Sequence, residues 1–268
     1  MSSAIKNQKE ILKKLGIQKL NPMQEEARLA IPTSAEVVLL SPTGTGKTLS
    51  FLLPIIAELD INCNEIQAIV IVPSRELAIQ IDESISIYGK HTGIKNVVIF
   101  GGVKQGGQTD ALRRGTDILV ATPGRLLDLI SQGFISLQDV KYFVLDEADR
   151  MLDMGFEDEI QEILSYMPPT RQNLLFSATY PDGVKSIRRV MGKDTIHINV
   201  TQSDNKPVIG EYWLPVDQYD RVKPLLAAMR VWGGALNLVF CNTKIDCAQV
   251  CETLIAAGLD AVALHGDL

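Results

Sequence analysis

A glycine-rich loop provides the first residues of this sequence that could do chemistry. It reads Ser41-Pro42-Thr43-Gly44-Thr45-Gly46-Lys47-Thr48, follows the apolar stretch 37–40 and precedes a helical pattern. Glycines allow backbone N–H groups to turn inward, and the N-terminus of a following helix attracts anions. The pattern predicts that residues 43–48 bind the phosphates of a nucleotide, with Lys47 at phosphate oxygens and Thr48 at Mg²⁺. Ser41 departs from the general motif, which has glycine there, and a plain turn with a solvated lysine is the alternative.

An acidic tetrapeptide, Asp146-Glu147-Ala148-Asp149, follows the apolar stretch 142–145. A carboxylate at the end of a parallel strand beside a phosphate loop suits Mg²⁺, so Asp146 is a candidate metal ligand. Glu147 is a candidate acceptor for the proton of an attacking water. The alternative is a pair of carboxylates that only stabilise the N-terminus of a helix. Together, the loop and the tetrapeptide predict hydrolysis of a nucleoside triphosphate.

Short apolar runs alternate with amphipathic stretches between residues 37 and 200. The runs predict strands at 37–40, 68–72, 97–100, 118–121, 143–145, 174–176 and 196–200. The amphipathic stretches predict helices at 49–59, 76–88, 126–131, 157–166 and 183–190. This alternation is typical of an α/β fold in which helices cover both faces of a parallel sheet.

A polar, proline-terminated stretch at 201–208 predicts a linker between two domains, 1–200 and 209–268. The second domain is predicted to contain strands at 210–214, 238–240 and 261–264 and helices at 219–229 and 245–256. So few elements leave sheet faces uncovered. We therefore expect the second domain to be incomplete at residue 268.

Composition and charge narrow the class of protein. A net charge of -6 and a pI of about 5.2 argue against strong sequence-independent binding of nucleic acid, which needs many Lys and Arg contacts to phosphate. No apolar run reaches the roughly 18 residues of a membrane span, and the N-terminus has no signal-peptide core, so we expect a cytoplasmic protein outside the membrane. Cys247 and Cys251 lie four positions apart and are expected to be buried thiols rather than metal ligands.

Further motifs, taken with the loop and the tetrapeptide, resemble those of superfamily 2 helicases, and Asp-Glu-Ala-Asp at 146–149 resembles the signature of the DEAD-box RNA helicases. In chain order the other motifs are Asn21-Pro22-Met23-Gln24, Pro73-Ser74-Arg75-Glu76-Leu77-Ala78, Gly101-Gly102, Thr122-Pro123-Gly124-Arg125, Ser177-Ala178-Thr179, 238–243 and His265-Gly266-Asp267. The family usually has Thr at the position of Ser74. The resemblance covers the chain from about residue 10 to residue 268. It implies a RecA-like domain followed by the first part of a second one.

The resemblance implies ATP and Mg²⁺ as cofactors and assigns roles to residues of the motifs. Gln24 would read the adenine edge, which an amide can do with two hydrogen bonds. The implied nucleotide-binding residues are Gln24, Thr43, Gly44, Thr45, Gly46, Lys47, Thr48 and Asp146, of which Thr48 and Asp146 would hold the metal. The implied catalytic residues are Lys47, Asp146, Glu147, Ser177 and Thr179, and the last two would link hydrolysis to strand separation.

RNA is the macromolecular partner that the resemblance implies, and contact with 2′-hydroxyls would favour RNA over DNA. The implied RNA-binding residues are Pro73, Arg75, Gly101, Gly102, Thr122, Gly124, Arg125 and Asp128. A monomer is expected, completed by the remainder of its own second domain. Segments 149–156, 239–244 and 264–268 resemble a bacterial subgroup that carries a C-terminal RNA-recognition domain and acts in assembly of the large ribosomal subunit, which implies ribosomal RNA as a candidate substrate.

Two departures from the family pattern bear on activity. Asn7 stands where an aromatic residue would stack on adenine, and no aromatic residue precedes Phe51, so we expect weaker ATP affinity. An arginine-bearing motif would follow Asp267, and such arginines can supply about 10³–10⁵ in rate. These 268 residues are therefore expected to have little RNA-stimulated ATPase or unwinding activity alone. A superfamily 2 DNA helicase and a non-catalytic fragment that binds RNA or protein remain the alternatives.

Overall fold

The computed structural model describes residues 8–42, 44–90, 92–179, 195–199, 210–216 and 221–266. The chain divides into two compact units, Met1–Asn205 and Lys206–Leu268. The predicted helix at 183–190 and the predicted linker at 201–208 lie outside the described residues, as does Thr43 of the loop. The domain limits given above stay predictions.

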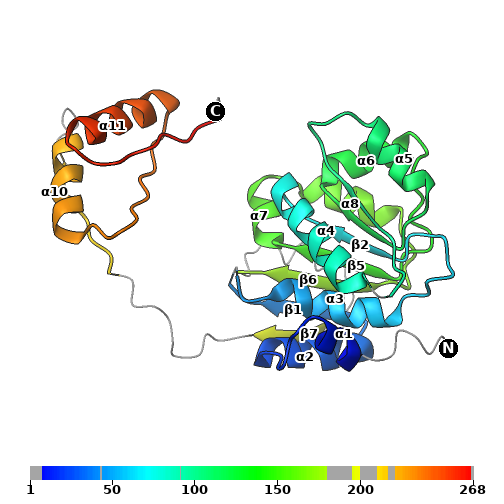
Figure 1. The fold of residues 1–268 in the computed structure, drawn as a ribbon. Coiled ribbons are helices and arrows are strands. Elements are labelled where there is room, and N and C mark those ends of the chain that lie inside the picture. The colour runs from blue at the N-terminus through cyan, green and yellow to red at the C-terminus, as the bar shows by residue number, and fades with distance from the viewer. Residues whose placement is uncertain are drawn as a thin grey trace. The chain divides into compact units, whose positions relative to one another are not determined.

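A seven-stranded parallel sheet forms the centre of the first unit, with the order β3-β4-β2-β5-β6-β1-β7 (Figure 1). Its strands are β1 (Glu36–Leu40), β2 (Ala68–Ile71), β3 (Asn96–Ile99), β4 (Ile118–Ala121), β5 (Tyr142–Asp146), β6 (Gln172–Ser177) and β7 (Thr195–Asn199). All strands predicted between residues 37 and 200 are confirmed, with small shifts at their ends. Because the strands are parallel, the loops that leave their carboxyl ends gather along one edge of the sheet.

Helices cover both faces of this sheet, as predicted (Figure 1). One face packs against α1 (Gln8–Lys14), α2 (Pro22–Ala30), α3 (Lys47–Glu58) and α4 (Arg75–Gly89). The other face packs against α5 (Gly106–Arg113), α6 (Pro123–Ser131), α7 (Ala148–Asp153) and α8 (Glu157–Ser165). Side chains alternate between the two layers along each strand, so Val144 of β5 joins the first layer while Phe143 and Leu145 join the second.

The helices predicted for this unit within the described residues are confirmed, but four others were missed: α1, α2, α5 and α7. The sequence carries a clear start signal for α2. Asn21 accepts a hydrogen bond from the backbone of Gln24, the Gln24 side chain bonds back to the backbone of Asn21, and Pro22 is the first helical residue. By contrast, α5 begins with Gly106-Gly107. Glycine disfavours the helical conformation, so the sequence of this segment did not indicate a helix. A short 3₁₀ turn, η1 (Ile31–Thr33), follows α2.

The second unit contains α10 (Val222–Trp232) and α11 (Lys244–Ala256), which match the two predicted helices. The strands predicted at 210–214, 238–240 and 261–264 are wrong, because none of these segments is a strand. A strand exists only where a neighbour pairs with its backbone groups. Leu238, Phe240 and Val262 are accordingly 79%, 88% and 92% exposed. None of the helices that the structure describes is long and apolar enough to cross a membrane.

Candidate active site and adjoining groove

The glycine-rich loop connects β1 to α3 at the carboxyl edge of the sheet. Gly44 and Gly46 have φ values of 79° and 85°, a left-handed conformation that costs glycine least. Ser41 is buried, and its Oγ lies 2.7 Å from Thr45 Oγ1, which in turn donates to the carbonyl of Pro42 at 2.8 Å. Ser41, which departs from the general motif, therefore stabilises the loop through hydrogen bonds within it.

Two side chains at the start of α2 form hydrogen bonds to the backbone of the loop. Asn21 Nδ2 donates to the carbonyl of Thr45 at 3.0 Å, and Gln24 Nε2 donates to the carbonyl of Gly46 at 3.2 Å. A Cβ atom at position 46 would lie 2.6 Å from Gln24 Nε2, so a larger residue there would displace the Gln24 amide, and the φ of 85° would strain it as well. The structure thus places Gln24 against the loop backbone, and its contact with adenine stays a prediction.

Lys47 and Asp146 bring opposite charges into the interior beside this loop. Lys47 is 7% exposed, and its Nζ has no hydrogen-bond partner among the described residues. Asp146, at the end of β5, is 3% exposed and accepts from the backbone N–H of Glu147 at 3.0 Å. Burial raises the pKa of Asp146 to about 6, although the nearby Lys47 ammonium lowers it. The Lys47 ammonium could therefore bind an anion, and the Asp146 carboxylate could bind a cation.

Glu147 has an unusual backbone for a residue with a side chain. Its φ of 55° lies in the left-handed region, and among the described residues it is the only non-glycine residue with positive φ. Such strain costs about 1–3 kcal/mol and is often retained at functional sites. The turn makes Glu147 the N-cap of α7, and its Oε2 accepts from Arg150 Nη1 at 3.2 Å.

Asp149 connects the acidic tetrapeptide to the end of β6. Its Oδ2 accepts from the backbone N–H and from Oγ1 of Thr179, both at 2.9 Å. Its own N–H donates to Ser177 Oγ at 3.2 Å. Burial would raise the pKa of Asp149, but the hydrogen bonds from Thr179 and Ser177 outweigh it and lower that pKa. Ser177 and Thr179 thus contact Asp149, and the backbone carbonyl of Ser177 also accepts from the N–H of Ser41, the first residue of the loop, at 3.0 Å.

The residues expected to contact RNA come together at the same edge of the sheet, after β2, β3 and β4. They line an open groove of about 430 Å³, made by Pro73, Arg75, Phe100, Gly101, Thr122, Gly124, Arg125, Asp128 and Phe156. Gly102 follows in the chain with a φ of 80° but is not among the lining residues. Phe100 and Phe156 were not predicted, although each adjoins a motif residue or a glycine in the sequence.

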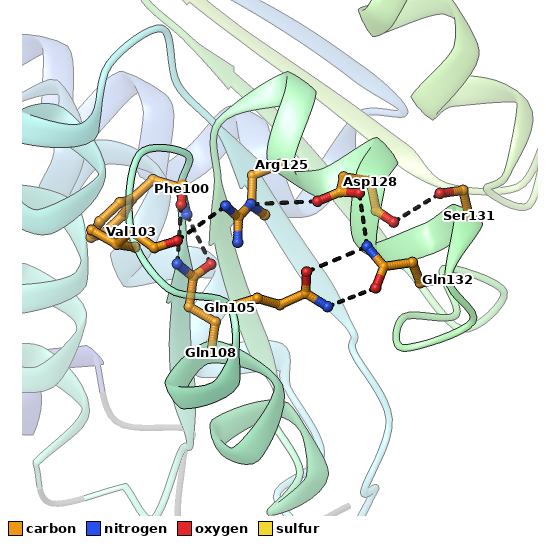
Figure 2. Close-up of polar contacts among 8 residues, drawn as sticks. All are labelled: Phe100, Val103, Gln105, Gln108, Arg125, Asp128, Ser131 and Gln132. Atoms are coloured by element: carbon orange, nitrogen blue, oxygen red, sulfur yellow. Dashed lines mark hydrogen bonds and ion pairs between the residues drawn. The ribbon is translucent and has the colours of Figure 1, made fainter.

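Arg125 is the cationic side chain held most tightly in the groove. Its side chain is 13% exposed, its Nη2 donates to the carbonyl of Val103 at 3.2 Å, and its Nε lies 3.7 Å from Asp128 Oδ2 (Figure 2). Its Nη1 is buried and has no hydrogen-bond partner among the described residues. Arg75 lies with its guanidinium carbon 5.1 Å from the ring centroid of Phe100. The groove therefore presents guanidinium donors on an apolar floor.

These residues fit a phosphorylated nucleotide at the loop. A buried ammonium without a protein acceptor fits an anion, and the left-handed glycines allow the loop backbone to approach it. Mg²⁺ binds through one or two carboxylates and keeps several waters, so Asp146 and the Thr48 hydroxyl are a sufficient donor set. Elsewhere in the described ranges, no cluster of three or more His, Cys, Asp or Glu could hold a metal, and the four cysteines are unpaired and half-buried.

Comparison with known proteins gives a consistent family. The model of the DEAD/DEAH box helicase family matches residues 21–187. The ATP-dependent RNA helicase DbpA of Escherichia coli K12 is 37% identical over 258 residues, which are 96% of this chain and 56% of DbpA. The DEAD-box ATP-dependent RNA helicase CshA of Streptococcus pneumoniae serotype 4 is 36% identical, over 96% of this chain and 49% of CshA. The chain spans about half the length of these curated relatives.

Solved structures agree with the sequence relatives. A DEAD box protein from the hyperthermophile Methanococcus jannaschii matches with a TM-score of 0.70 and 34% identity, over 100% of this chain and 72% of that one. A hypothetical ATP-dependent RNA helicase from Sulfolobus tokodaii matches with a TM-score of 0.63 and 31% identity, over 75% of this chain and 57% of that one. The predicted α/β, RecA-like fold is confirmed. The chain belongs to the DEAD/DEAH box helicase family.

Proposed function

We propose that this chain binds ATP and Mg²⁺ at the glycine-rich loop and single-stranded RNA in the adjoining groove, as part of an ATP-dependent RNA helicase that destabilises short RNA duplexes. The observation that carries the proposal is Lys47 Nζ, which is buried beside the ionisable Asp146 and has no hydrogen-bond partner among the described residues. A buried charge without a partner is costly, so its retention favours a ligand that neutralises it.

The chain's own residues divide the work at the nucleotide. Lys47 and the loop N–H groups would hold phosphate oxygens, and Thr48 and Asp146 would hold Mg²⁺. Bound Mg²⁺ neutralises negative charge that develops on the transferred phosphate. Glu147 orients the attacking water and accepts its proton, and the ion pair with Arg150 limits the rotation of its carboxylate.

Asp149 connects the acidic tetrapeptide to the segment that follows β6. Asp149 follows the catalytic Glu147 closely in the chain and is bonded to both Ser177 and Thr179. A shift of the acidic tetrapeptide on hydrolysis would therefore pull on the segment after β6. We propose that these contacts couple hydrolysis to strand separation.

RNA binding is proposed to be local rather than a property of the whole surface. A net charge of -6 gives little general attraction to phosphate. Arg75 and Arg125, which line the groove, supply guanidinium groups that suit phosphate geometry. The resemblance to the subgroup that acts in ribosome assembly favours ribosomal RNA as the substrate class, and preferential retention of ribosomal over unrelated RNA by the immobilised chain would test it.

We also propose that these 268 residues hydrolyse ATP slowly on their own. Among the described residues, the charged groups that shift the pKa of Asp146 are Lys47, Glu147 and Asp149, and none of these is an arginine. In phosphoryl transfer an arginine that stabilises the transition state is worth about 10³–10⁵ in rate. Turnover at the rate of a complete two-domain helicase would contradict this proposal.

A Glu147→Gln substitution separates binding from hydrolysis. The amide keeps the size of the side chain but cannot accept the proton, so we expect fluorescent ADP·Mg²⁺ to bind with unchanged affinity while single-turnover ATP hydrolysis is lost. Asp139→Asn, on the loop before β5, is the matched control and should leave both unchanged. Unchanged hydrolysis in Glu147→Gln would overturn the role proposed for this carboxylate.

A further inference from the structure

Two glutamines outside the recognised motifs connect the helices that border the groove. Gln105 is the N-cap of α5, and Gln132 is the C-cap of α6. Gln105 Nε2 donates to Gln132 Oε1 at 2.7 Å, and Gln132 Nε2 donates to Gln105 Oε1 at 3.4 Å (Figure 2). This reciprocal pair, the amide clasp, joins segments 27 positions apart in the sequence.

Asp128 fixes the orientation of the amide clasp. Gln132 Nε2 also donates to Asp128 Oδ1 at 2.7 Å (Figure 2). A carboxylate only accepts hydrogen bonds, so it requires the amide nitrogen of Gln132 and leaves the amide oxygen for Gln105. The second oxygen, Oδ2, lies 3.7 Å from Arg125 Nε. The carboxylate of Asp128 is therefore divided between the clasp and the guanidinium.

Arg125 is the end of this series of contacts. Its Nε faces Asp128 and its Nη2 is held by the carbonyl of Val103, which leaves the buried Nη1 without a partner among the described residues. A guanidinium is planar, so fixing two of its nitrogens also fixes the direction of the third. The amide clasp therefore acts, through Asp128, on the direction of a guanidinium that lines the groove.

The segment between β3 and α5 is held at three points. Gln108 accepts from the backbone N–H of Phe100 at 3.2 Å and donates to its carbonyl at 3.0 Å. Arg125 binds the carbonyl of Val103, and the clasp holds Gln105. Gly101 and Gly102 lie between these points, so their backbone groups are positioned relative to α6 by side chains rather than by regular structure.

We propose that Gln105 and Gln132 are positioning residues for RNA. The amide clasp holds segment 100–105 and the α6 helix at the separation at which the Arg125 guanidinium and the backbone of Gly101 and Gly102 reach the same RNA strand. This inference rests on the proposed binding of RNA in the groove and assigns to two residues outside the motifs the task of preorganising it.

The test is a double-mutant cycle on the full chain, read as the Kd for a short fluorescein-labelled oligouridylate by anisotropy. Both amides lie at the surface, where a hydrogen bond contributes little, so Gln105→Leu and Gln132→Leu should each weaken binding about three- to tenfold. Each substitution breaks the same pair, so the double variant should bind no more weakly than Gln132→Leu alone. The Kd for ADP·Mg²⁺ and the Tm should stay at the wild-type values.

Gln138→Leu is the matched control, because Gln138 is an exposed glutamine whose amide donates to the carbonyl of Tyr166 outside the groove. It should leave RNA affinity unchanged. Additive losses from the two single variants, unchanged RNA affinity in both, or equal losses of RNA and ADP affinity would each overturn the proposal. Arg125→Ala distinguishes the proposed role of the clasp from the proposed binding of RNA in the groove. If Arg125→Ala weakens RNA binding while the glutamine variants do not, only the role of the clasp is wrong. If neither Arg125→Ala nor the glutamine variants change RNA affinity, the proposed binding of RNA in the groove is wrong as well.

Discussion

The proposed nucleotide site and the proposed RNA groove lie at the same edge of one parallel sheet, yet they are built differently. Lys47 and Asp146 are almost completely buried, and Lys47 Nζ has no hydrogen-bond partner among the described residues. In the groove, Asp128 is 48% exposed and shares its oxygens between two partners. Buried charges interact strongly and individually, whereas exposed polar groups contribute small, shared amounts. Single substitutions should therefore have large effects at the first site and graded effects at the second.

Lys47→Ala should have the largest effect of these substitutions on ligand affinity. A small effect would show that the two sites do not differ in the way described above. Loss of the buried Lys47 ammonium removes charged hydrogen bonds to phosphate, so the Kd for fluorescent ADP·Mg²⁺ should rise on the order of 10²-fold. RNA affinity measured without nucleotide should not change. Lys90→Ala, which alters an exposed lysine at the end of α4, is the control for both titrations. A loss of less than threefold would mean that Lys47 does not bind phosphate.

Asp146→Asn should stabilise the fold at neutral pH. Burial raises the pKa of Asp146 from its ordinary value of 3.8 to about 6, so between these values the folded state binds more protons than the unfolded state. The wild-type carboxyl therefore favours folding below about pH 4, and this contribution is lost as pH rises through about 6. Removing the charge should raise the free energy of unfolding by about 1–3 kcal/mol above that range.

Urea unfolding at neutral pH and at about pH 4 measures this effect, and the gain should vanish at the lower pH. Asp139→Asn, in an exposed loop, controls for the general effect of removing a carboxylate. The same Asp146→Asn variant should lose the Mg²⁺ dependence of nucleotide binding. A gain in stability that is equal at both pH values would contradict the assignment of the buried charge to Asp146.

Arg125→Ala tests the graded behaviour of the groove. We expect the Kd for a short RNA to rise about tenfold and the salt dependence of binding to fall by about one phosphate contact, because the Arg125 guanidinium lines the groove and suits phosphate geometry. Nucleotide affinity should stay unchanged. Arg28→Ala, whose guanidinium pairs with Glu25 within α2, is the control. Loss of all RNA binding in Arg125→Ala would show that one residue dominates this site too.

Thr179→Val should have the smallest effect. It removes one of two bonds from Thr179 to Asp149, a site near the surface, so the free energy of unfolding at neutral pH should fall by about 0.5–1 kcal/mol. Hydrogen bonds lower the pKa of Asp149, so their contribution is present above pH 3.8 and is lost as pH falls through the lowered value. Urea unfolding against pH measures this. Thr33→Val should show no such pH dependence, because the Thr33 hydroxyl donates to the backbone carbonyls of Leu29 and Ala30.

The candidate nucleotide site could be located from the sequence because its residues are contiguous, although its ligand stays a prediction. The loop at 41–48 and the tetrapeptide at 146–149 each carry their chemistry in one short stretch, and parallel strands bring their ends together. What the sequence could not predict is how contacts are shared. Gln24 was assigned to adenine, whereas its amide also holds the carbonyl of Gly46, a contact between segments 22 positions apart. No local pattern encodes such contacts.

The remaining errors have a similar cause. The amide clasp joins Gln105 and Gln132, which look like ordinary surface residues until α5 and α6 are placed side by side. In the second unit, the apolar runs at 238–240 and 261–264 have the composition of buried strands, but composition reports only the potential to pair. Whether a neighbouring strand exists is a property of the fold, and within the described part of that unit no strand forms.

The central claim, two separate ligand sites on one sheet edge, is tested most directly by hydrogen–deuterium exchange of the full chain with ADP·Mg²⁺ and, separately, with a short single-stranded RNA. Nucleotide should slow exchange of the backbone amides at 44–48 and 146–149. RNA should slow exchange at 100–105 and 122–128 and leave the loop amides unaffected. Protection of the same peptides by both ligands, or RNA protection away from the groove, would contradict the account.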